Sequence, residues 1–150
     1  MEKKDLKPAG VFKYFEEICQ VPRPSKKEEK MIAYLKAFGA KHNLETKVDE
    51  AGNVLIKKPA TPGKENLQTV VLQSHIDMVC EKNNDVQHDF LTDPIETEID
   101  GEWLKAKGTT LGADNGIGVA TELAILADDS IEHGPLECLF TVDEETGLTG

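Results

Sequence analysis

The chain has 150 residues, of which 39% are hydrophobic and 30% are charged, a balance that excludes a disordered polypeptide and allows a domain with a sizeable core. The formal net charge of −11 argues against a nucleic acid partner, because phosphate groups would be repelled. Three cysteines without a CxxC pair argue against a disulfide framework or a thiolate zinc site, and the lack of any long apolar stretch predicts no membrane partner and a cytoplasmic location.

The first third of the chain predicts two amphipathic helices. Apolar side chains recur at helical spacing over residues 8–19, which is typical of a helix with one face in the core. Ser25 and Glu28 have the spacing of a capping box. This spacing predicts that a second helix begins at Lys26.

Strands are predicted in the middle of the chain. Residues 45–49 and 53–57 read as two strands joined by a short turn. The apolar run at residues 69–72 predicts a strand that is covered on both faces. Residues 95–99 and 102–105 alternate in polarity around an Asp-Gly pair, which indicates a hairpin.

The last third predicts a glycine-rich loop, a helix and a strand. The loop covers residues 108–116, and the strand covers residues 136–142. The intervening helix is predicted to turn the following residues inward: Ile117, Ala120, Leu123, Ala124 and Leu126. This order of elements favours an α/β domain with at least two helices packed on a sheet.

His75 and Asp77 follow the predicted strand at residues 69–72. Residues two apart on an extended chain face the same way, so both side chains are expected in one pocket beyond the strand end. Asp77 would then accept a hydrogen bond from a metal-binding His75. The alternative is a hydrogen-bonded core histidine beside an aspartate that caps a loop.

Asp114 lies between two glycines, Gly112 and Gly116, which permit unusual backbone angles and a close approach to a ligand. The alternative is that Asp114 caps the helix that follows. Glu144 and Glu145 come directly after the last predicted strand. Adjacent carboxylates repel each other, and a cation would relieve this repulsion; the alternative is an exposed acidic turn.

These motifs resemble the M20 metallopeptidase family. The resemblance rests on three stretches: SHIDMV at residues 74–79, GTTLGADNG at residues 108–116 and DEETG at residues 143–147. Within the family, the sequences of the first two stretches are most similar to those of the aminoacyl-histidine dipeptidases. The resemblance implies an α/β catalytic domain with a mixed sheet, flanking helices and two zinc ions.

The resemblance also implies a role for each motif residue. His75 would ligate one zinc ion, Asp77 would orient His75, and Glu145 would ligate the other zinc ion. Asp114 would bridge both ions, and the peptide bond after it would be cis. Glu144 would be the general base that deprotonates a metal-bridged water. Manganese or cobalt would also suit such oxygen and nitrogen ligands.

Family members have parts that these 150 residues do not contain. Two further metal ligands, an acid and a histidine, come from later in the chain, and a lid or dimerisation domain is inserted after this region. Residues 1–150 are therefore expected to be the N-terminal portion of the catalytic domain, inactive alone, in an enzyme that hydrolyses Xaa-His dipeptides and forms a homodimer at full length. Two alternatives remain: another M20 hydrolase, such as an aminoacylase or a carboxypeptidase, and a non-catalytic metal-binding or interaction module.

Overall fold

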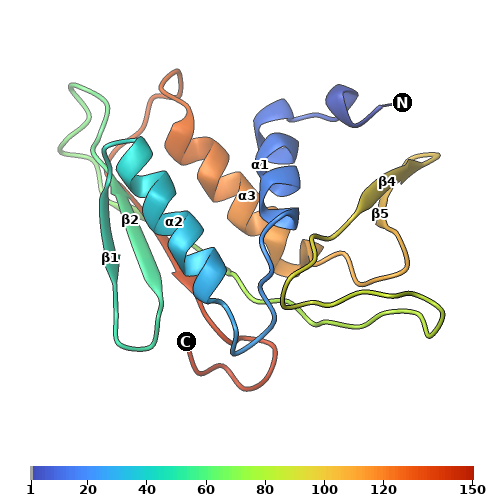
Figure 1. The fold of residues 1–150 in the computed structure, drawn as a ribbon. Coiled ribbons are helices and arrows are strands. Elements are labelled where there is room, and N and C mark those ends of the chain that lie inside the picture. The colour runs from blue at the N-terminus through green and yellow to red at the C-terminus, as the bar shows by residue number, and fades with distance from the viewer. Residues whose placement is uncertain (1) are drawn as a thin grey trace.

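The protein is described by a computed structural model that covers residues 2–150, with three helices on one face of a four-stranded sheet and a hairpin beside them (Figure 1). A short 3-10 turn precedes the helices, which are α1 (Ala9–Cys19), α2 (Glu29–Lys41) and α3 (Ala113–Ala127). The strands of the sheet are β1 (Glu45–Val48), β2 (Val54–Lys58), β3 (Val70–His75) and β6 (Leu136–Thr141). The hairpin consists of β4 (Thr97–Asp100) and β5 (Trp103–Ala106).

The sheet is mixed, and its strand order is β1-β2-β6-β3. β1 and β2 are antiparallel, as are β2 and β6, whereas β3 and β6 run parallel. Val70 pairs with Leu136 at one end of the parallel pair, and His75 pairs with Thr141 at the other. The carboxyl ends of β3 and β6 therefore lie together at one edge of the sheet, where open α/β sheets place their functional sites.

The core lies between the helices and the face of the sheet that they cover. α2 packs on β1 and β2, α3 packs on β3, and α1 packs on α3. Side chains that alternate along β2 and β6 point into this layer, as the two-residue period of a half-covered strand requires. Large side chains with no exposed surface include Phe15, Met31, Leu35, Ile56, Leu123 and Phe140.

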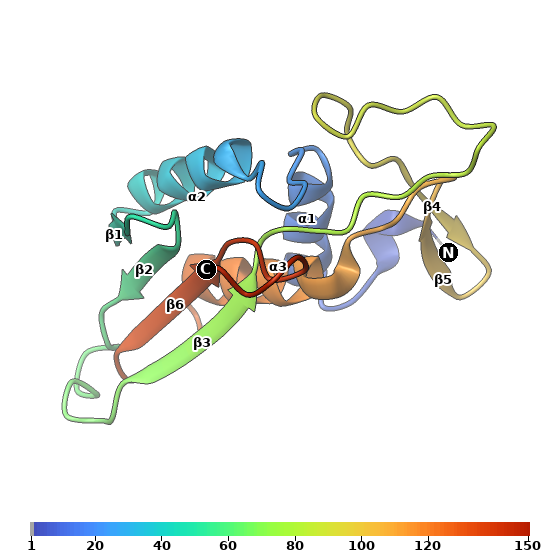
Figure 2. The same cartoon turned by 90° about the horizontal axis from the view of Figure 1, so that it is seen from below.

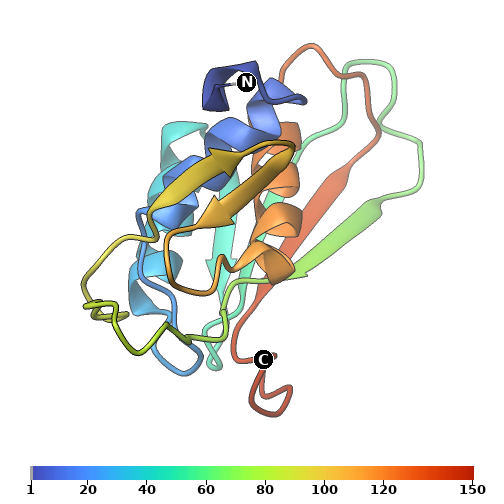
Figure 3. The same ribbon diagram turned by 90° about the vertical axis from the view of Figure 1, so that its right-hand side faces the viewer.

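The prediction that the strand at residues 69–72 is covered on both faces is wrong. Val71 of β3 is 56% exposed, and Val70 is exposed as well. All three helices lie on the other side of the sheet (Figure 3), and β3 is an edge strand. Val70 and Val71 are therefore exposed, whereas Leu72 of the same run packs against the core.

Two helix predictions also need correction. α2 begins at Glu29 rather than at Lys26, whose φ of 66° places it in the left-handed region. In α3, Ile117 is exposed and Val119 is buried instead. The backbone of Asp114 is not helical, so the regular part of α3 begins later and its inward face follows Val119 and Leu123.

The β4–β5 hairpin lies on the far side of the helices from β1 and β2 (Figure 2). Trp103 at its tip is 73% exposed. None of the helices in residues 2–150 has the length and apolar character needed to cross a membrane.

Candidate metal centre

The structure brings all five predicted site residues together at the carboxyl ends of β3 and β6. His75 is the last residue of β3, and Asp77 follows it. Glu144 and Glu145 lie in the turn after β6, while Asp114 lies at the start of α3. Three segments that are far apart in the sequence therefore meet at one edge of the sheet.

The imidazole of His75 is held between two carboxylates. Its Nδ1 lies 3.2 Å from both the backbone oxygen and Oδ1 of Asp77. Both Asp77 atoms are acceptors, so they favour the tautomer that has the proton on Nδ1. Nε2 faces Asp114, whose Oδ1 lies 2.9 Å away.

Asp77 is fully buried, and its carboxylate organises the turn after β6. Its two oxygens accept hydrogen bonds from the backbone N–H groups of Glu144, at 3.0 Å, and Glu145, at 3.2 Å. The Ser25 hydroxyl donates a third, at 2.6 Å. Burial would raise the pKa of Asp77, but these hydrogen bonds outweigh burial and hold the pKa below its ordinary value. Asp77 therefore stays ionised beside His75.

Asp114 reaches outward at the rim of the site, and its side chain is 86% exposed. The peptide bond between Asp114 and Asn115 is cis, as the resemblance implies. Gly112 before it has a φ of 71°, a left-handed conformation that glycine adopts without steric cost.

The two glutamates face the same space as His75 and Asp114. Glu144 Oε2 lies 3.8 Å from His75 Nε2. One donor atom each from His75, Asp114 and Glu145 lie within 4.8 Å of one another. Partial burial, followed by the nearby Asp114 carboxylate, raises the pKa of Glu145, so a negative charge at this position is disfavoured in the protein alone.

This arrangement fits a divalent cation. Nε2 of His75 and an oxygen of Asp114 lie 2.9 Å apart. With the ring proton on Nδ1 both atoms are acceptors, and a cation bound to both would remove their repulsion. Among the side chains that the structure describes, no lysine or arginine pairs with Asp114 or Glu145. One imidazole nitrogen and several carboxylate oxygens form a donor set that suits zinc, manganese or cobalt.

Comparison with known protein families matches residues 71–150, more than half of the chain, to "Peptidase family M20/M25/M40". The chain belongs to this family. The matched segment contains all five of the predicted site residues, and the family assignment confirms the resemblance carried by the three motifs.

Two relatives of this M20 chain are named as dipeptidases. The cytosol non-specific dipeptidase of Escherichia coli is 52% identical over 149 residues, which is 99% of this chain and 31% of the relative. The aminoacylhistidine dipeptidase of Vibrio alginolyticus has a crystal structure that matches 100% of this chain and 31% of its own length, with 55% identity and a TM-score of 0.96. An aminopeptidase from Bacillus cereus matches 94% of this chain and 38% of its own length, with 25% identity and a TM-score of 0.77. These matches confirm the predicted mixed α/β fold, and the chain spans about a third of the length of each protein.

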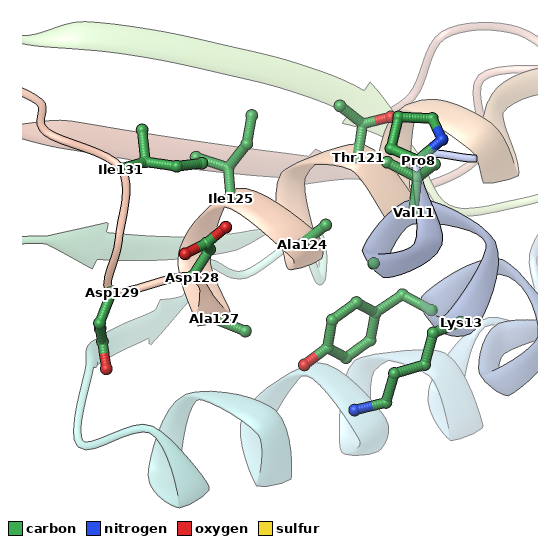
Figure 4. A pocket seen from close by; sticks show the side chains of 12 residues that line it. Pro8, Val11, Lys13, Thr121, Ala124, Ile125, Ala127, Asp128, Asp129 and Ile131 are labelled. Carbon is green, nitrogen blue, oxygen red and sulfur yellow. The ribbon is translucent and has the colours of Figure 1, made fainter.

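Two cavities of the M20 chain differ in their relation to these residues. A cavity of about 530 Å³ opens between α1 and α3 and is lined by Val11 and Lys13 of α1 and by Ala124 of α3 (Figure 4). None of the predicted site residues lines it. A second cavity, of about 330 Å³, is lined by His75 and Glu144. We place the candidate site at the second cavity, because chemistry depends on convergent polar groups rather than on cavity size.

Ser25 and Glu28 contact this site, although their spacing predicted that they cap α2. Their capping-box spacing is real, but neither side chain caps α2 in the predicted way. Ser25 donates its hydroxyl proton to Asp77, and Glu28 accepts the backbone N–H of Asp143 at 2.9 Å. A sequence signal therefore existed at both positions, but spacing alone did not identify the partners.

Proposed function

We propose that this chain is the N-terminal portion of the catalytic domain of a metal-dependent dipeptidase that hydrolyses Xaa-His dipeptides. The observation that carries the proposal is the convergence of His75, Asp114 and Glu145 within 4.8 Å in a chain of the M20 family. The name of the Vibrio alginolyticus relative supports the substrate class. In this proposal, two divalent cations, zinc or alternatively manganese or cobalt, bind to these three residues.

The remaining metal ligands, a lid or dimerisation domain and the C-terminal catalytic part would lie in the rest of the enzyme. The span of about a third of each relative supports this division. Residues 1–150 would contribute too few ligands for a closed catalytic site, which typically has about three per zinc. We therefore expect the chain alone to bind metal weakly and to lack activity. A homodimer in the cytoplasm is the expected setting of the full-length enzyme.

Asp77 and His75 would act as a fixed pair. Asp77 accepts the Nδ1 proton of His75, which fixes the tautomer and keeps the Nε2 lone pair directed at the metal position. The same carboxylate accepts the backbone N–H groups of Glu144 and Glu145. The Asp77 carboxylate thus fixes the position of His75 relative to the turn that carries the two glutamates.

Glu144 would move the proton. Its side chain is partly exposed, and its Oε2 lies 3.8 Å from His75 Nε2, so it can reach a water molecule at the same position. Bound cations would polarise the scissile carbonyl and make the attacking water more acidic. Glu144 would then accept the proton of that water and deliver it to the leaving amine.

The test compares two adjacent glutamates in the full-length enzyme. Glu144→Ala should abolish hydrolysis and leave the metal content near normal, because Glu144 moves a proton. Glu145→Ala should lower the zinc content, because Glu145 is a ligand. Glu102→Ala, on the exposed turn of the hairpin, is the matched control and should change neither quantity. Retained turnover in Glu144→Ala would refute the mechanism.

The substrate class has its own test. Turnover of Xaa-His dipeptides should exceed turnover of N-acyl amino acids and of longer peptides by the same enzyme. A preference for N-acyl amino acids or for C-terminal residues of longer peptides would instead identify an aminoacylase or a carboxypeptidase. Absence of both activities in a zinc-loaded enzyme would favour a non-catalytic module.

A further inference from the structure

The connection between α1 and α2 contacts every segment that carries a predicted site residue. This connection, residues 20–28, lies outside the three motifs that resemble the M20 family. It supplies three polar side chains that point inward: Arg23, Ser25 and Glu28. Each of the three contacts a different part of the candidate metal centre.

Arg23 contacts two segments of the candidate site. The residue is 2% exposed. Its Nη1 donates to the backbone oxygen of Ile76 at 3.0 Å, and its Nη2 donates to the backbone oxygen of Gly112 at 2.7 Å. Its own backbone oxygen accepts the N–H of Met78 at 3.1 Å. One side chain therefore joins the segment of His75 and Asp77 to the loop that leads to Asp114.

The glycines around Asp114 make room for this guanidinium. A Cβ atom added at Gly112 or at Gly116 would lie 2.6 Å from Nη2 of Arg23, well inside van der Waals contact. Only glycine at both positions lets the Asp114 loop approach Arg23 this closely. The glycine spacing of the loop is thus matched to a side chain about ninety residues upstream.

Ser25 and Glu28 extend the same connection to the other half of the site. Ser25 donates to Oδ2 of Asp77 at 2.6 Å. Glu28 Oε1 accepts the N–H of Asp143 at 2.9 Å and that of Lys26 at 3.0 Å. The turn that carries Glu144 and Glu145 is therefore fixed at Asp143 by the residues that precede α2.

We propose that Arg23 is a positioning residue, which sets the distance between the His75–Asp77 pair and Asp114 by binding the carbonyls of Ile76 and Gly112. This inference depends on the proposed function, because it treats these residues as a metal site. Without the guanidinium, the buried Ile76 carbonyl loses the Arg23 donor, the Gly112 carbonyl keeps only the N–H of Gly116, and the Asp114 loop loses this link to the end of β3. The ligands would then no longer be held in one arrangement, and metal affinity would fall.

The experiment measures the zinc affinity of the full-length enzyme by competition with a chromophoric chelator. Arg23→Met should weaken zinc binding about 10- to 100-fold, the usual effect of removing a group that orients ligands. Arg23→Lys should recover part of the loss, because it can still donate to one carbonyl. Lys27→Met is the matched control, since Lys27 is exposed and lies in the same connection, and the substitution also replaces one positive charge by methionine. The affinity of this variant should equal that of the wild type.

A second readout needs no metal. In ¹⁵N-histidine NMR spectra of the metal-free enzyme, Arg23→Met should change the ring signals of His75, because the end of β3 is no longer linked to the Asp114 loop, while Lys27→Met should leave them unchanged. Wild-type affinity and an unchanged His75 spectrum in Arg23→Met would overturn the proposal. If the full-length wild-type enzyme binds no zinc, the proposed metal site fails, and the His75 spectrum alone decides whether Arg23 positions the pair.

The contact between Gly116 and Arg23 allows a further test, which is still informative if Arg23→Met folds poorly. Gly116→Ala should weaken zinc binding in the wild type because its methyl group displaces the guanidinium. In the Arg23→Lys background, whose shorter head group leaves more room, the same change should cost less. Equal losses in both backgrounds would show that the two positions are independent and would contradict the proposal.

Discussion

Glu122 of α3 should make the stability of this protein fall as the pH rises from about 4.5 to about 7. Its carboxyl is buried in the layer between α3 and the sheet. Burial raises its pKa from 4.5 to about 7, although the neighbouring Ser74 and Cys138 side chains act in the opposite direction. Its Oε2 has no hydrogen-bond partner among the described residues, so the ionised form is poorly compensated.

The size of the effect follows from linkage. The folded state keeps the Glu122 proton up to a pH of about 7, whereas the unfolded chain releases it near 4.5. Between these values the folded state binds more protons, so its free energy of unfolding falls by about 1.4 kcal/mol per pH unit. The total loss is about 3 kcal/mol, complete above the folded pKa and absent below the unfolded pKa.

The assay is urea unfolding of the wild type and of Glu122→Gln at a series of pH values from 5 to 8.5. Glutamine has a similar shape and no charge, so the other titrating groups cancel in the difference between the two proteins. Relative to the wild type, Glu122→Gln should gain about 2–3 kcal/mol of stability between the two ends of the series. A difference that does not change with pH, or that changes in the opposite direction, would refute the reasoning.

Two further predictions concern packing. Lys58→Met should lower the free energy of unfolding by about 1–3 kcal/mol, because the buried ammonium donates to the backbone oxygens of Ile125 and Asp128 at the end of α3. Lys57→Met is the control, because it removes a more exposed ion pair. It should lower the free energy of unfolding by less than about 1 kcal/mol in the same urea titration. Gly118→Ala should destabilise by about 1–3 kcal/mol because its methyl group would meet the Asn115 and Ser74 side chains. Gly10→Ala, where the methyl group makes an ordinary contact, should leave the thermal midpoint unchanged or raise it.

The order of elements and the proximity of the five candidate residues were predictable from the sequence. Apolar periodicity locates β6 and the interior of α1 because packing on one face demands that periodicity. The two-residue period of a strand correctly predicted that the side chains of His75 and Asp77 lie together beyond the strand end. The structure adds that β3 and β6 are parallel neighbours, which brings both residues into contact with the turn that carries Glu144 and Glu145.

The partners of isolated polar side chains were not predictable in this way. Ser25 and Glu28 fit a local capping pattern, yet they contact residues more than fifty positions away, and local spacing carries no information about such contacts. Arg23 showed no pattern at all. The exposure of Val71 depends on what covers the outer face of β3, which the strand's own residues do not encode.

The position of Trp103 decides which spectroscopic probe can follow these experiments. It is the only tryptophan in the chain, and it is largely exposed at the tip of the hairpin, remote from the sheet (Figure 2). Indole fluorescence depends on the change from an apolar to an aqueous environment, so its emission should shift little when the core unfolds. Tyr14 is buried and packs edge-on against Phe38, with ring centroids 5.7 Å apart, so near-ultraviolet circular dichroism of the tyrosines should report the loss of the core.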